Sequence, residues 1–109
     1  MKRAAEIDRL EGLARLVLDL RLADLSRVAR QRQECLDRLA ALEPAAAENL
    51  DPVSAARALL LYQAWADGRR AEINGTLARL TAEWAQKSAA ARTAFARTEA
   101  LRLVKARIG

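Results

Sequence analysis

The stretch from Asp51 to Ile108 constrains the fold more than any other part of the sequence, because one spacing of three and four residues runs through it without a change of phase. Asp51 suits the N-cap position of a helix, and Pro52 suits the first helical position, where its missing N–H costs nothing. A helix is therefore predicted over residues 52–108. The positions in phase, which we call the long seam, are Ala56, Leu59, Gln63, Ala66, Arg70, Ile73, Leu77, Leu80, Trp84, Lys87, Ala91, Ala94, Thr98, Leu101, Lys105 and Ile108.

The long seam is typical of a coiled-coil helix that packs against one neighbour. It is strongest from Ile73 to Trp84 and weaker towards both ends. Polar residues occupy several of the remaining would-be core positions, namely Gln63, Arg70, Lys87 and Lys105. The seam is therefore expected to hold one partner helix and not a deep core.

Residues from about 3 to 43 form the other predicted helix. Its apolar residues follow a drifting stripe that steps by four several times, which indicates a stutter in any supercoil. The stripe consists of Leu10, Ala14, Leu18, Leu22, Leu25, Ala29, Leu36 and Leu39, and it is widened near its start by Leu13, Leu16, Val17 and Leu20.

Pro44 ends this helix, because proline lacks the N–H of the helical ladder and biases the preceding residue away from helical geometry. The connection over residues 44–51 is short, and short connections favour antiparallel neighbours. We therefore predict an all-α fold: an antiparallel two-helix coiled-coil hairpin with a longer, continuous second helix, forming one domain over residues 1–109. The first helix is expected to lie along the second from about Pro52 to Arg92, so that residues 92–109 project beyond it.

One alternative organisation divides the second helix. Asn74-Gly75 is a strong turn dipeptide, and together with Asp67-Gly68 it would give a three-helix bundle. Ile73 and Leu77 keep the long seam in phase across Asn74-Gly75, however, and a turn usually disturbs the phase. The continuous helix is therefore the preferred prediction.

The composition excludes most catalytic and metal chemistry. The 109 residues contain no histidine and a single cysteine, Cys35, so neither an intramolecular disulfide nor a Cys/His zinc site can form. Nothing resembles a phosphate-binding glycine loop or a nucleophile–base–acid arrangement. We therefore predict a non-enzymatic protein with no catalytic residue, cofactor or metal, and the role of Cys35 stays open.

The sequence also favours a soluble protein of the cytoplasm. No apolar run is long enough to span a membrane, and acidic and basic residues interrupt the N-terminal stretch too often for a signal peptide. A single thiol suits a reducing compartment.

Positive charge is concentrated at the end of the second predicted helix. Residues 69–109 carry nine Lys or Arg against three Asp or Glu, whereas residues 1–43 carry nine against eight. Four of the arginines recur every five residues, so they wrap round the helix instead of forming a stripe. The basic residues of this end are expected either to bind an acidic partner or simply to keep an exposed helix solvated. Its candidate binding residues are Arg92, Arg97, Arg102, Lys105 and Arg107.

The aromatic residues give a second candidate surface. Trp84 lies on the long seam and is predicted to be core, whereas Tyr62 and Trp65 lie off it. Tyr62 and Trp65 are therefore expected either to form an exposed aromatic patch near the hairpin bend, available to a partner, or to pack on a wider interface.

The run Leu61-Tyr62-Gln63-Ala64-Trp65, followed by Ile73, Leu77, Leu80, Arg92, Leu101 and the basic ending Lys105-Ala106-Arg107, resembles the second half of the flagellar export protein FliJ and its type III secretion relatives. The resemblance implies a coiled-coil stalk or adaptor of the bacterial flagellar export apparatus. The implied partners are the hexameric export ATPase, the export gate and export chaperones, and the implied location is peripheral to an inner-membrane export complex. The basic end would meet the ATPase ring, and the patch at Tyr62 would bind a partner.

Two alternatives belong to other functional classes. A basic helical arm could grip a nucleic-acid backbone, with binding that weakens steeply as salt rises. Sequence-specific DNA reading is a minor alternative, because a reading helix presents basic residues with Asn, Ser or Thr on one face. Alternatively, two hairpins could bury their apolar faces as a homodimeric four-helix bundle that needs no outside partner.

Overall fold

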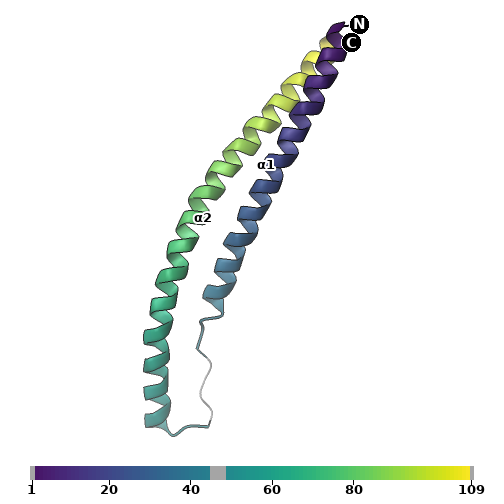
Figure 1. Ribbon diagram of the computed structural model, residues 1–109. Helices are drawn as coiled ribbons and strands as arrows, with labels where there is room; N and C mark the ends of the chain where they lie inside the picture. The colour runs from purple at the N-terminus through teal and green to yellow at the C-terminus, as the bar shows by residue number, and fades with distance from the viewer. Residues whose placement is uncertain (1, 45–48, 109) are drawn as a thin grey trace. The chain divides into compact units, whose positions relative to one another are not determined.

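The computed structural model describes residues 2–44 and 49–108, which form two α-helices (Figure 1). Helix α1 spans Lys2–Ala40, and helix α2 spans Pro52–Ile108. The predicted all-α hairpin with a longer second helix is confirmed. Helix α2 continues through Asn74 and Gly75 without interruption, so the three-helix alternative is wrong.

The start of α2 is held by the predicted cap. The Asp51 carboxylate accepts hydrogen bonds from the Ser54 backbone N–H and from the Ser54 hydroxyl, both at 2.8 Å. The Asp51 carbonyl also accepts the Ala55 N–H at 2.8 Å. Because these donors stabilise the charged carboxylate, the backbone N–H of Ser54 most of all, the pKa of Asp51 is lowered from its usual 3.8.

The end of α1 comes earlier than predicted. The helix stops at Ala40 instead of about residue 43, and the N–H groups of Leu42 and Glu43 bond to carbonyls three residues back. Such bonds tighten the last turn of a helix and release the chain. The pre-proline position of Glu43 accounts for this early end. Residues 45–48 of the predicted connection lie outside the described residues.

The chain divides into two compact units. The bend unit comprises Gln31–Thr81, and the terminal unit comprises Met1–Arg30 with Ala82–Gly109. In the bend unit the core consists of buried Cys35, Leu42, Ala66 and Ile73, packed against half-buried Leu39, Tyr62, Leu77 and Leu80. Arg32 Nε donates to the Thr81 hydroxyl at 3.1 Å, and Tyr62 Oη donates to the Leu42 carbonyl at 3.1 Å. The helices of this unit are therefore antiparallel.

In the terminal unit, ion pairs between α1 and α2 give the same orientation. Asp8 Oδ1 lies 2.7 Å from Lys105 Nζ, and Asp24 Oδ2 lies 3.7 Å from Lys87 Nζ. Buried residues of this unit include Val28 in α1 and Ala91, Ala94 and Thr98 in α2. The small side chains of these α2 positions keep the core thin. The long seam is thus buried or half-buried from Ala66 to Leu101, as its spacing predicts, and exposed nearer the helix ends.

The prediction that residues 92–109 project beyond α1 is wrong. Lys105 pairs with Asp8 and Glu11, so the last turns of α2 have the first turns of α1 beside them. In the bend unit the register also differs from the one expected, because the Leu42 carbonyl accepts a hydrogen bond from Tyr62, ten positions after Pro52.

The predicted stripe on α1 is half wrong: Ala14, Leu18, Leu25 and Leu39 are half-buried as predicted, and the other four positions are exposed. The residues of α1 and the turn after it that are buried or half-buried keep one heptad phase, although Arg21 at an intervening in-phase position is exposed, so no stutter is needed. They include Ile7, Glu11, Ala14, Leu18, Leu25, Val28, Arg32, Cys35, Leu39 and Leu42, which we call the α1 seam. Leu10, Leu22, Ala29 and Leu36 of the predicted stripe are exposed instead.

Candidate functional site

The two aromatic residues near the bend have different roles. Tyr62 is half-buried against the core of the bend unit, and its hydroxyl caps the Leu42 carbonyl beyond the end of α1. Trp65 is 57% exposed, and its ring lies 5.7 Å from the Tyr62 ring at a tilt of 46°. Leu61, one helical turn before Trp65, is 69% exposed. We call Leu61, Tyr62 and Trp65 the aromatic patch: Tyr62 is its packed base, and the other two side chains face outward.

The basic residues at the end of α2 separate into two groups. Arg102 pairs with Glu99 on the same helix at 3.0 Å, and Lys105 pairs with α1. Hydrogen bonding to Asp8, and the charges of Asp8 and Glu11, raise the pKa of Lys105 above its usual 10.5. The remaining candidates are Arg92, Arg97 and Arg107, which are exposed, and among the described residues no ion pair is found for them.

Glu11 brings a carboxylate into the α1 seam. Its side chain is only 15% exposed, and its Oε2 atom lies 3.5 Å from Lys105 Nζ, outside hydrogen-bonding geometry. Its Oε1 atom lies 3.6 Å from Arg15. A polar pair at seam positions weakens a coiled coil but favours the register in which the pair forms. Glu11 and Lys105 therefore contribute to the alignment of the helices in the terminal unit.

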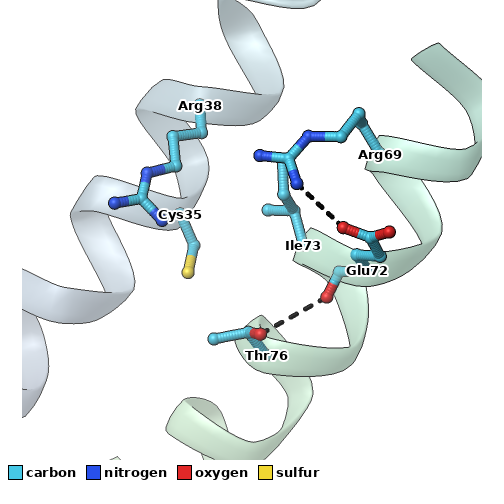
Figure 2. Close-up of a pocket in the computed structure, with 6 residues that line it drawn as sticks. All are labelled: Cys35, Arg38, Arg69, Glu72, Ile73 and Thr76. Carbon is cyan, nitrogen blue, oxygen red and sulfur yellow. Dashed lines mark hydrogen bonds and ion pairs between the residues drawn. The ribbon is translucent and has the colours of Figure 1, made fainter. Parts of the chain in front are cut away.

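A pocket of about 110 Å³ lies in the bend unit (Figure 2). Cys35 and Arg38 line it from α1, and Arg69, Glu72, Ile73 and Thr76 line it from α2. Both the carboxylate and the backbone carbonyl of Glu72 have partners within α2. Its Oε2 atom is 2.8 Å from Arg69 Nη1, and its carbonyl accepts a hydrogen bond from the Thr76 hydroxyl at 3.3 Å. Ligand pockets usually enclose at least about 300 Å³. This space is therefore a packing gap beside the buried thiol.

No group of three or more His, Cys, Asp or Glu that could hold a metal ion occurs among the residues described. Neither described helix has an apolar window long enough to cross a membrane.

One surface was missed by sequence reasoning. Leu10, Leu13, Leu16, Val17 and Leu20 are all exposed on α1, and we call them the outer face of α1. Their spacing in the sequence predicts a buried stripe that includes Leu10 and is widened by Leu13, Leu16, Val17 and Leu20. The structure separates the two stripes.

Comparison of the chain with family models, with curated proteins and with solved structures found no match.

Proposed function

We propose that the chain is a non-enzymatic coiled-coil adaptor that binds a protein partner through the aromatic patch. The observation that carries this proposal is the exposure of Trp65 and Leu61 beside an anchored Tyr62. Tryptophan is enriched among the residues that dominate binding energy at protein interfaces. The hydrogen bond from Tyr62 to Leu42 fixes the base of the patch, so less side-chain freedom is lost on binding.

We propose the ATPase of a bacterial type III export apparatus as the partner. The resemblance of residues 61–65 and of the basic ending to the FliJ family supports this choice. The exposed guanidinium groups of Arg92 and Arg97 supply positive charge for an acidic surface, and such charge mainly speeds association. Lys105 and Arg102 contribute less, because acids of this chain already neutralise them.

The test measures binding of the purified full chain to a flagellar-type export ATPase on a sensor surface. Trp65→Ala should weaken binding by about 30-fold or more, because a loss of this size is typical when a residue that dominates an interface is truncated. Phe95→Ala is the matched control, because Phe95 is an equally exposed aromatic residue of α2 that lies outside the patch. Equal effects of the two substitutions would contradict a specific role for the patch.

The charge contribution has its own variant. Arg92→Glu with Arg97→Glu should slow association severalfold at low salt and have little effect at high salt. If the wild-type chain does not bind the ATPase but binds duplex RNA with a steep salt dependence, the nucleic-acid alternative replaces this proposal.

A further inference from the structure

The outer face of α1 is a second apolar stripe on a helix that already buries one. The α1 seam faces α2, whereas the outer face is centred on Leu13 and Leu20, about 130° round the helix axis. Leu13 is 60% exposed and Leu20 is 67% exposed. Isolated exposed leucines are ordinary on protein surfaces. A continuous row of five apolar side chains with helical spacing is different, because it forms a surface ready to pack against another helix.

The area of this face is enough for an interface. From their exposed fractions, the five side chains present about 500 Å², in the upper part of the range for the largest apolar patch of a monomer. A twofold contact between two such faces would bury about 1,000 Å² in total, the lower bound for a specific interface. The flanking charged side chains add to that figure.

Charged residues flank the outer face on the same side of α1. Glu6 and Arg9 precede the apolar row, and Asp24 and Arg27 follow it. If a second α1 lies antiparallel with the twofold axis between Leu16 and Val17, Glu6 lies opposite Arg27 of the second copy. The same axis puts Arg9 opposite Asp24 of the second copy. A parallel arrangement would put each charge opposite itself.

The same axis also matches the apolar residues. It puts Leu13 opposite Leu20 of the second copy and Leu16 opposite Val17 of the second copy. Asp24 and Arg27 also form ion pairs with α2 at 3.7 and 3.6 Å. Their side chains are still 39% and 46% exposed, so they are able to face a second chain as well.

We propose that the chain forms a closed homodimer in which the outer faces of two α1 helices pack antiparallel about a twofold axis between Leu16 and Val17. The occupant of this face is thus a second copy of the same chain. Because the contact is twofold, association stops at the dimer. This inference does not depend on the proposed function, since the aromatic patch lies on other residues.

The experiment is light scattering combined with sedimentation of the full chain over a range of concentrations. The wild type should be a dimer at micromolar concentration. Leu13→Glu with Leu20→Glu should raise the dissociation constant by more than about 100-fold, because it puts four carboxylates into the interface. Glutamate is a good helix former, and both positions are exposed, so helix content by circular dichroism should be unchanged.

A matched control places the same substitutions elsewhere. Val53→Glu with Leu60→Glu changes two equally exposed apolar residues of α2, also seven positions apart and outside the aromatic patch, and should leave the dimer intact. A wild-type monomer at all concentrations would overturn the proposal. So would a dimer that survives the α1 substitutions, or assemblies that keep growing with concentration.

The orientation has a separate test that leaves the apolar row untouched. Glu6→Arg puts a cation opposite Arg27 of the second copy, so the dissociation constant should rise about tenfold at low salt. Asp19→Arg, at an exposed acid about 100° away round α1, should have no effect. In a parallel dimer Glu6→Arg only exchanges one like-charged pair for another. An unchanged dissociation constant would therefore overturn the antiparallel pairing.

Discussion

Individual residues of this chain act mainly at its helix ends. The Asp51 carboxylate satisfies the first N–H groups of α2, and Tyr62 satisfies the Leu42 carbonyl where the chain leaves α1. The unpaired backbone groups of a helix end are costly when they are not satisfied. Two side chains thus define the bend from both sides, although neither lies in the long seam.

The Asp51 cap should respond to pH. Its folded-state pKa is lowered, so its contribution to stability is present above the unfolded value of 3.8 and is lost as pH falls through the folded value. Asp51→Asn keeps a capping side chain that does not titrate. At neutral pH the Ser54 amide should be similarly protected from hydrogen exchange in both proteins. As the pH is lowered progressively below 3.8, it should become better protected in the variant. A difference that does not change with pH would contradict this role.

At the scale of the helices, the sequence predicts α2 better than α1. In α2 one spacing of apolar residues stands out, and its positions from Ala66 to Leu101 are buried or half-buried. In α1 two apolar stripes share the same turns. The predicted stripe combines half-buried residues such as Leu18 with exposed ones such as Leu10, and it leaves out the buried Val28 and Cys35. Periodicity identifies an apolar face but does not say which of two faces a neighbour covers.

The pairing of the helices could not be predicted for a related reason. The length of a connection limits the partners of a helix but does not fix their offset. The offset here depends on particular contacts, such as the Lys105 pair with Asp8 and the Tyr62 bond to Leu42. Of the candidate site residues, Trp65, Arg92, Arg97 and Arg107 are exposed, while Tyr62 and Lys105 take part in packing or pairing within the chain.

The continuity of α2 leads to a prediction at Gly75. A methyl group added there meets no atom within 4 Å, and the residue has ordinary helical geometry. Gly75→Ala should therefore raise the free energy of unfolding by about 0.5–1 kcal/mol through helix propensity. Urea denaturation measures this change. Gly68→Ala, in equally open surroundings, should give a similar gain. A loss of stability at Gly75 would mean that the helix needs a break there.

At the scale of the whole molecule, few apolar side chains are buried among the described residues, and most of those are small. Many large apolar side chains stay exposed, including the outer face of α1. Small domains with shallow cores commonly gain stability from association. We therefore expect folding and dimerisation of this chain to be coupled, so that dimerisation contributes to the stability of the folded state.

Thermal unfolding should accordingly depend on protein concentration. If the folded chain is a dimer, the melting temperature should rise by several degrees between about 1 and about 100 µM. Calorimetry or circular dichroism at these concentrations measures the shift. The variant Leu13→Glu with Leu20→Glu should melt at one temperature throughout. Concentration-independent melting of the wild type would contradict a coupling of assembly to stability.

The two tryptophans lie in different units, Trp65 in the bend unit and Trp84 in the terminal unit. Trp65 is exposed and Trp84 is half-buried, so their indole rings meet different amounts of water. Fluorescence from an exposed indole is shifted to longer wavelength and is quenched more readily by dissolved iodide. Replacing either tryptophan with phenylalanine leaves an emission that comes from one unit only. The chain thus carries two optical reporters of its own, and each follows one part of the molecule without an added label.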